Sequence, residues 1–285
     1  MSDLWERLRD DPAAQQEKEV VLAAVAEEGI ALQFASPELQ DDPEVVATAV
    51  KQDADALEYV SERLRGSREV VAAAVEQNGA VLRFAAPHLW TDRTLLLAAV
   101  QQDGRLLKLG EGTGLSKDKE IVRAAVAQDG DALEFADEEM RADKEAPGTP
   151  QLDNQGIPQI AWISGLVEVV LLAVSTSGTN LQLAAQELQD DPEVVRAAIK
   201  FDGLSLQFAS LRLRADRDMV LAAICQNGCA LEFASEALRQ EREVVWQAVN
   251  RTPRSLALAL GGLADDEELE ELARDVRCRI QETGR

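Results

Sequence analysis

The sequence repeats itself with a period of about 25 residues. The stretch EVVLAAVAEEGIALQFASPELQDDPEVV begins at Glu19 and returns to its opening letters at Glu44. Repeats of this length are typical of solenoids, in which each repeat buries its apolar face only against its neighbours. Alignment on this signal gives nine repeats, which begin at Lys18, Pro43, Arg68, Arg93, Lys119, Val167, Pro192, Arg217 and Arg242.

Each repeat is predicted to begin with an amphipathic helix. Asp42 and Asp191 stand where an N-cap is expected, and each is followed by proline and then glutamate. Apolar residues recur at positions three, four, seven and eight of the repeat, on one face of a 3.6-residue period. Position seven is alanine throughout, which predicts closely approaching helices: Ala24, Ala49, Ala74, Ala99, Ala125, Ala173, Ala198, Ala223 and Ala248.

A glycine follows the last apolar residue of this helix in seven repeats: Gly29, Gly79, Gly104, Gly130, Gly178, Gly203 and Gly228. We expect it to close the helix in the left-handed conformation, which glycine adopts without a steric penalty. Ala54 should strain this turn, and Pro253 should force a different one. A brief second helix and a capped turn such as SPEL, anchored by Leu39, are predicted to complete the repeat.

Two phrases, KEIVRAAVAQDGDALEFAD and EVVAAAVEQNGAVLRFAA, resemble the repeat family known as domain of unknown function 4116. The resemblance runs from about Lys18 to Asp143 and from Val167 to Asp266. It implies a helical repeat and no particular activity, because no functional residues are established for that family. The expected fold class is therefore all-α: an α-solenoid of about nine two-helix repeats, with polar capping helices and one inserted loop.

The pattern divides the chain into five segments. We expect an N-terminal cap over 1–17, five repeats over 18–143, an irregular insertion within a repeat over 144–168, four repeats over 169–266 and a C-terminal capping helix over 267–285. The insertion is rich in proline and glycine. A tolerated surface loop is the simpler interpretation, and docking of its apolar part on the array or on a partner is the alternative. With both caps present, the chain is expected to be complete.

The charge of the chain narrows the classes of partner. Lys and Arg total 29 against 52 Asp and Glu, so the net charge of −23 repels nucleic-acid phosphates and anionic membranes. The longest apolar run, Ile160–Val174, is shorter than a membrane span and contains Glu168. The first residues lack a secretory signal, and the three cysteines suit free thiols. We therefore expect no nucleic acid, no membrane, and an intracellular location in the cytoplasm or nucleus.

No catalytic, cofactor or metal signature stands out. His88 is the single histidine, and it follows Pro87 in a position where other repeats carry exposed charged residues. Cys225 and Cys229 flank a turn, but a structural zinc site needs four ligands and no second pair lies nearby. The glycines follow the repeat and form no phosphate-binding loop. We expect a protein that is not an enzyme, with no catalytic residue, no cofactor and no metal.

Two sets of residues are candidates for binding. One is a polar ladder, in which the same slot of the second helix holds Gln33, Glu58, Arg83, Lys108, Glu134, Gln182, Gln207 and Glu232. It can line a binding surface, although a solvated face explains it more simply. The other is a set of aromatic residues outside the core slots, Trp90, Trp162, Phe201 and Trp246, which are either partner contacts or local packing.

These observations favour an acidic scaffold that mediates protein–protein interaction. A protein partner is expected, and the negative charge would suit a basic one. The alternatives are a ligand- or substrate-recognition module serving an enzyme on another chain, and a structural subunit of a larger assembly. No feature of the sequence indicates an oligomeric state.

Overall fold

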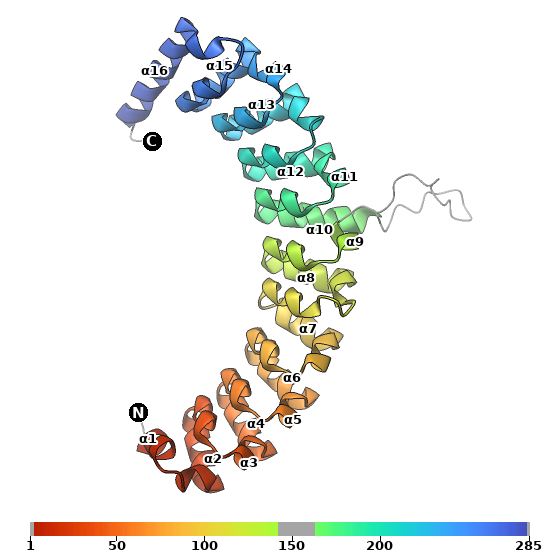
Figure 1. Cartoon of the computed structure of the whole chain (residues 1–285), viewed down its shortest axis with the longest axis vertical. Coiled ribbons are helices and arrows are strands. Elements are labelled where there is room, and N and C mark those ends of the chain that lie inside the picture. The colour runs from red at the N-terminus through yellow and green to blue at the C-terminus, as the bar shows by residue number, and fades with distance from the viewer. Residues whose placement is uncertain (1–2, 142–162, 284–285) are drawn as a thin grey trace, which may run out of the picture. The chain divides into compact units, whose positions relative to one another are not determined.

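The chain is helical throughout the residues that the structure, a computed structural model, describes. These are residues 3–141 and 163–283, and they contain no strand. The chain divides into two compact halves, Met1–Ala136 and Asp137–Arg285, and each half is a stack of helical repeats (Figure 1). The predicted all-α solenoid is confirmed.

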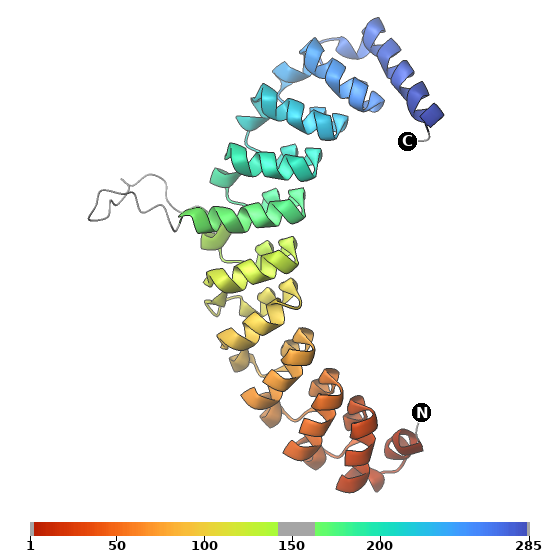
Figure 2. The same ribbon diagram turned by 180° about the vertical axis from the view of Figure 1, so that it is seen from behind.

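A row of long helices forms one layer of each half. In the N-terminal half they are α2 (Lys18–Glu27), α4 (Pro43–Gln52), α6 (Arg68–Gln77), α7 (Arg93–Val100) and α8 (Lys119–Gln128). In the C-terminal half they are α10 (Ile163–Thr176), α12 (Pro192–Phe201), α13 (Arg217–Gln226), α15 (Arg242–Arg251) and α16 (Glu267–Thr283). Within each half, consecutive long helices pack side by side (Figure 2).

A row of 3-10 helices forms the second layer, and each of these packs on its long helix and on the next 3-10 helix of the same half. They are η2 (Gly29–Phe34), η3 (Ala54–Tyr59), η4 (Gly79–Phe84), η6 (Gly104–Gly110), η8 (Gly130–Phe135), η9 (Gly178–Leu183), η10 (Gly203–Phe208), η12 (Gly228–Phe233) and η13 (Pro253–Leu258).

Short helical turns lead from this layer to the next long helix. They are α3 (Pro37–Gln40), α5 (Glu62–Arg65), η5 (Pro87–Thr91), η7 (Leu115–Lys117), α9 (Glu138–Arg141), α11 (Gln186–Gln189), η11 (Leu213–Ala215), α14 (Glu236–Arg239) and η14 (Leu263–Asp265). Two further elements, α1 (Asp3–Asp10) and η1 (Ala14–Gln16), precede the first repeat.

The long helices begin and pack as their sequence predicts. The Asp42 carboxylate accepts hydrogen bonds from the backbone N–H groups of Glu44 and Val45, at 2.9 and 3.2 Å, and Asp191 caps α12 in the same way. The alanines at position seven are almost completely buried in all nine repeats. A larger side chain there would overpack the contact between neighbouring helices.

The glycines after the long helices are not left-handed, so this prediction is wrong. Among the described residues, positive φ values occur only at Gly112, Gly114, Gly261 and Gly262. A methyl group on Gly203 would overlap the carbonyl oxygen of Ala223, the position-seven alanine of the next repeat. Gly29, Gly104 and Gly228 meet the corresponding carbonyls in the same way. Glycine is needed here because neighbouring backbones approach closely, a role it has elsewhere in tight contacts.

The two exceptions to the glycine rule form the same element as the other repeats. Ala54 begins η3 and Pro253 begins η13, and both 3-10 helices have the usual six residues. The different turn expected at Pro253 is therefore wrong, and Ala54 has no positive φ, so it escapes the left-handed strain that was expected there. Proline fits because the first position of a helix has no need of a backbone N–H donor.

The inserted segment ends before residue 163, earlier than predicted. Residues 163–168 were expected to be irregular, but α10 begins at Ile163 and includes them. Their apolar sequence continues the helix backwards from the repeat, and a single glycine within it is tolerated. The rest of the predicted insertion, together with Asp143, falls in residues 142–162 and lies outside the described residues.

The last long helix, α16, has a polar outer face. Leu269 and Ala273 are buried against the preceding repeat. Glu270 and Arg274 are exposed in positions four and eight, which hold buried apolar residues in the other repeats. This side of α16 is therefore unsuited to stacking a further repeat in the same way.

Candidate interaction surface

Many charged side chains join neighbouring repeats. The basic residue that begins a repeat reaches the acidic residue at the N-cap of the next long helix, at N–O distances from 2.7 to 3.4 Å. These pairs are Lys18 with Asp42, Arg68 with Asp92, Arg93 with Asp118, Arg217 with Glu241, and Arg242 with Asp266. Each exposed pair contributes little, about 0–1 kcal/mol, but the row explains many of the charges as structural.

The Asp-Asp-Pro sequences supply a second kind of link. Their second aspartate caps the helix, whereas the first, Asp41 or Asp190, bonds to side chains one repeat further on. Asp41 accepts hydrogen bonds from the Ser61 hydroxyl and the Arg63 guanidinium. Asp190 accepts the same pair of bonds from Ser210 and Arg212. Hydrogen bonds from serine and arginine lower the pKa of both carboxyls, so they stay ionised at neutral pH.

Asp92 shows how these carboxylates stabilise the fold. Partial burial raises the pKa of its carboxyl, but hydrogen bonds from Thr94 and Arg68 outweigh burial and lower the pKa to about 2. A folded pKa below the ordinary value of about 4 means that the ionised group stabilises the fold above pH 4. This contribution is lost as the pH falls through 2.

Asp92→Asn is therefore expected to destabilise the protein in a pH-dependent way. Asparagine can still cap α7, but it loses the charge that pairs with Arg68. We expect the free energy of unfolding to fall by about 1 kcal/mol at pH 7 and the difference from the unsubstituted protein to shrink between pH 4 and pH 2. Urea denaturation across this range measures it. An equal loss at every pH would contradict the assignment.

Glutamines at position ten link α4, α6 and α7 to the repeat before each of them. The Gln102 amide accepts a hydrogen bond from the Gly79 N–H at 2.8 Å and donates one to the Val75 carbonyl at 2.7 Å. Gln52 accepts from the Gly29 N–H in the same way, but it donates to the carbonyl of Glu27, two residues further along the preceding helix than the position of Val75. The amide thus pairs with a backbone N–H and a backbone carbonyl where one repeat turns next to another.

Phe201 takes the place of this glutamine in α12. A phenyl ring can neither accept from the Gly178 N–H nor donate to a carbonyl, so the link between repeats is lost. The ring is also 56% exposed. Phe201 therefore lacks the bond that Gln52, Gln77 and Gln102 make in the N-terminal half, and it leaves a large apolar surface in water.

The other aromatic candidates lie in different surroundings. The Trp90 indole donates to the Leu82 carbonyl at 3.0 Å, as the Gln40 and Gln189 amides do in their repeats, so its position is explained by local packing. Trp246 is 39% exposed and lies beside Arg242 on α15. Trp162 lies outside the described residues.

An exposed leucine was missed by the sequence reasoning. Leu211 is 80% exposed, in a slot that holds Pro37 or Glu62 in other repeats. That substitution of an apolar for a polar residue was the available signal. The Leu211 surroundings include Glu187, Asp190 and Arg212.

The polar ladder forms two rows on the stacked 3-10 helices, one in each half. Gln33, Glu58, Arg83, Lys108 and Glu134 lie in the N-terminal half, and Gln182, Gln207 and Glu232 lie in the other. The Arg83 guanidinium lies over the Phe84 ring, at 4.6 Å from its centroid. The row of the N-terminal half carries both signs of charge, and all ladder residues but Gln33 are exposed. The ladder's role in binding stays a prediction.

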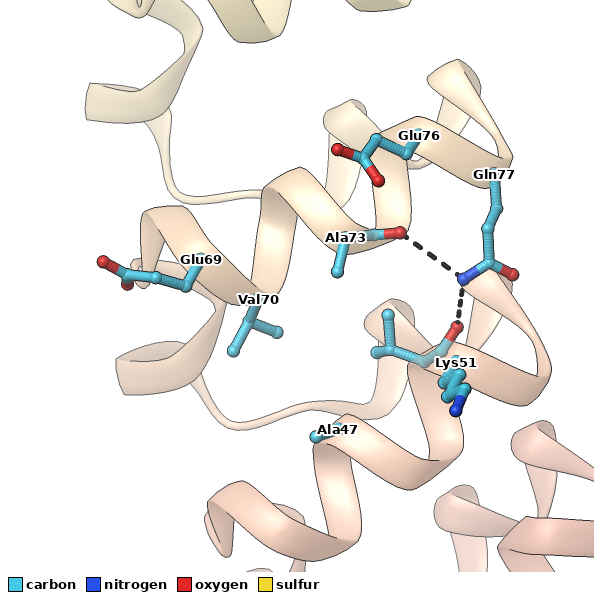
Figure 3. Close-up of a pocket in the computed structure, with 8 residues that line it drawn as sticks. Ala47, Lys51, Glu69, Val70, Ala73, Glu76 and Gln77 are labelled. Carbon is cyan, nitrogen blue, oxygen red and sulfur yellow. Dashed lines mark hydrogen bonds between the residues drawn. The ribbon is translucent and has the colours of Figure 1, made fainter.

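The surface between α4 and α6 contains an apolar groove of about 440 Å³ (Figure 3). Ala47, Val50, Val70 and Ala73 line its walls. Lys51, Glu69, Glu76 and Gln77 complete the lining with polar groups. The sequence reasoning did not single out these residues.

The described residues show no cluster of metal-binding side chains. They contain no group of three or more His, Cys, Asp or Glu that could hold a metal. His88 is exposed at the start of η5, and Cys225, Cys229 and Cys278 are free thiols. Over the same part of the chain, no helix is long and apolar enough to cross a membrane.

Comparison with known proteins gives a family. The family model described as "Domain of unknown function (DUF4116)" matches residues 17–65, 67–109, 115–145, 167–214 and 216–259. These matches follow the helical repeats. No curated protein and no solved structure matches the chain.

Proposed function

Because the chain belongs to the family described as domain of unknown function DUF4116, we propose its function from the surface of its repeats. It is a non-enzymatic helical-repeat scaffold that binds another protein, and Phe201 is a contact for that partner. Stacked repeats present extended surfaces that suit this role. The single observation that carries the proposal is the substitution of an exposed phenylalanine for a bonding glutamine.

The exposed position of Phe201 supports a role in binding a partner. An exposed aromatic side chain loses the benefit of burial, and here it also costs the protein the hydrogen bonds that Gln52 and Gln102 make. Aromatic residues are frequent at the energetic centres of interfaces, where a partner buries them. A binding role offsets both losses, whereas local packing offsets neither.

The partner is expected to be basic. The chain carries a net charge of −23, and complementary charge speeds encounter and disfavours acidic competitors. The charged pairs between repeats hold many carboxylates in place, but other acidic side chains, such as Glu232 and Glu193, are exposed on the surface without a place in these pairs. Binding should therefore weaken as salt rises.

Phe201→Gln is expected to separate binding from stability. The new amide can restore the missing bonds to the preceding repeat, so the free energy of unfolding should rise by about 0.5–1.5 kcal/mol. Partner capture from a native extract, identified by mass spectrometry, should be lost. The matched control is Trp90→Gln, which restores the residue found at Gln40 and should leave capture unchanged.

The outcomes separate the alternatives. A partner captured equally by Phe201→Gln would remove Phe201 from the interface and contradict the proposal. Turnover of a substrate by the purified chain would exclude a non-enzymatic role. If no protein is captured at low or high salt, a ligand-recognition module serving an enzyme on another chain would replace the scaffold.

A further inference from the structure

The groove between α4 and α6 exists because one side chain is missing. In four other repeats, position five is leucine: Leu22, Leu97, Leu171 and Leu221. The residue at position three of the following repeat is then fully buried in every case: Val45, Ile121, Val194 and Val244. Position five of α4 is Ala47, and the following Val70 is partly exposed. The groove therefore lies where these four repeats have a leucine side chain.

A neighbouring repeat shows that this gap is not an automatic result of alanine. Position five of α6 is also alanine, Ala72, but the following position-three residue is the larger Leu95. Leu95 is buried, so the bulkier side chain fills the space from the opposite wall. Among the described pairs of neighbouring long helices, only α4 and α6 have a small side chain on both walls, Ala47 on one and Val70 on the other.

The two walls of the groove are held at a fixed spacing. The Gln77 amide donates to the Val50 carbonyl at 2.9 Å and to the Ala73 carbonyl at 3.4 Å, so it ties α6 to α4 at one end of the groove (Figure 3). A preformed groove loses little conformational entropy when it is filled.

The charged residues of the groove are two glutamates and one lysine. Glu69 and Glu76 lie seven residues apart on α6, at the two ends of its exposed face, and Lys51 lies on the α4 wall (Figure 3). No ion pair joins these three side chains in the described part of the chain. The Ser67 hydroxyl donates to the Glu69 carboxylate at 2.9 Å, which fixes one of the two acids.

We propose that the α4–α6 groove binds a leucine-sized aliphatic side chain from a basic segment of a partner protein. The aliphatic side chain fills the place of the missing leucine, and flanking Lys or Arg residues pair with Glu69 and Glu76. This inference rests on the proposed role as an interaction scaffold, but it uses a different half of the chain from Phe201. Burial of the side chain supplies affinity, and the two carboxylates select a basic sequence.

A basic partner fits the groove better than a second copy of this chain. Leu211, the most exposed leucine among the described residues, lies beside Glu187 and Asp190. The two nearby arginines are already engaged, Arg212 with the Asp190 carboxylate and Arg214 with the Phe233 carbonyl. Docking Leu211 into the groove would bring these acids toward Glu69 and Glu76. The net charge of −23 on each copy adds to that repulsion.

Selection from a random 12-residue peptide display library on the full chain tests the proposal. We expect enriched peptides to share Leu or Ile flanked by Lys or Arg. The affinity of a labelled consensus peptide is then measured by fluorescence anisotropy. Ala47→Leu, which supplies the residue found in four other repeats, should weaken binding at least about tenfold. Ala72→Leu, the same change one repeat further on, should change it less than about twofold.

A second pair of variants tests the charges. Glu69→Gln/Glu76→Gln should weaken binding about three- to tenfold at low salt, with a smaller difference at high salt. The control Glu62→Gln/Glu236→Gln removes two exposed charges from the short helices α5 and α14. The change in the logarithm of the peptide's dissociation constant should be less than half of the change caused by Glu69→Gln/Glu76→Gln.

Several results would overturn the proposal. They are the absence of enrichment, an acidic or uncharged consensus, equal affinity for Ala47→Leu, and a consensus that matches residues 209–214 and assembles copies of the chain. Phe201→Gln should bind the peptide normally. If the groove fails its peptide test but partner capture still depends on Phe201, the groove proposal is wrong and the scaffold role holds. If peptide binding behaves as expected but Phe201→Gln captures the partner normally, the role of Phe201 is wrong and the groove proposal holds.

Discussion

Replacing Ala173 with aspartate is expected to unfold repeats of the C-terminal half while the N-terminal half stays folded. Ala173 is fully buried in α10, which packs against α12. A carboxylate placed there without a partner should cost about 3–5 kcal/mol. Since the repeats of a solenoid contact only their neighbours, the loss stays local and cooperative unfolding should split.

Calorimetry of Ala173→Asp should show two heat-absorption peaks, and hydrogen exchange should locate the less stable one in the C-terminal half. The matched control is Ser175→Asp, which adds the same charge two residues further along α10 at an exposed position. The control should unfold like the unsubstituted protein. A single transition for Ala173→Asp, lowered as a whole, would show that the two halves unfold as one unit and would contradict the one-dimensional description.

Features confined to one repeat could be predicted from the sequence. Asp42 with Pro43 defines a helix start by local chemistry, and the alanines at position seven define a close helix contact by recurrence. The glycine conformation was predicted wrongly because its cause lies outside the repeat. Gly203 is constrained by Ala223, twenty residues later, and a helix-end rule describes only the residues on either side of the turn.

The candidate surface shows the same limit. The sequence marked Phe201 and Trp90 equally, because both are large aromatic residues outside the core slots. The structure separates them: the Trp90 indole reproduces the hydrogen bond of Gln40, and Phe201 reproduces nothing. The groove beside Ala47 was missed because an absent side chain gives no conspicuous residue. The comparison of Ala47 with Leu22 in the same slot was the signal available for it.

Gly203→Ala is expected to destabilise the C-terminal half by about 3 kcal/mol, because the new methyl group overlaps the backbone carbonyl of Ala223 and one repeat must move away from the next. Gly203→Asn decides between this cause and the left-handed turn expected from sequence. Asparagine tolerates the left-handed conformation better than alanine does, so a conformational cause predicts a smaller loss for asparagine. A steric cause predicts an equal or larger loss.

Gly262 is the matched control site for that test. Urea denaturation measures the free energy of unfolding of the alanine and asparagine variants at both sites. Gly262 has a φ of 81°, and a methyl group on it would meet nothing within 4 Å. There, asparagine should cost less than alanine, with both losses near 1 kcal/mol. The order of the two substitutions should thus reverse between Gly262 and Gly203. The same order at both sites would mean that backbone conformation, and not the approach of neighbouring repeats, requires glycine at Gly203.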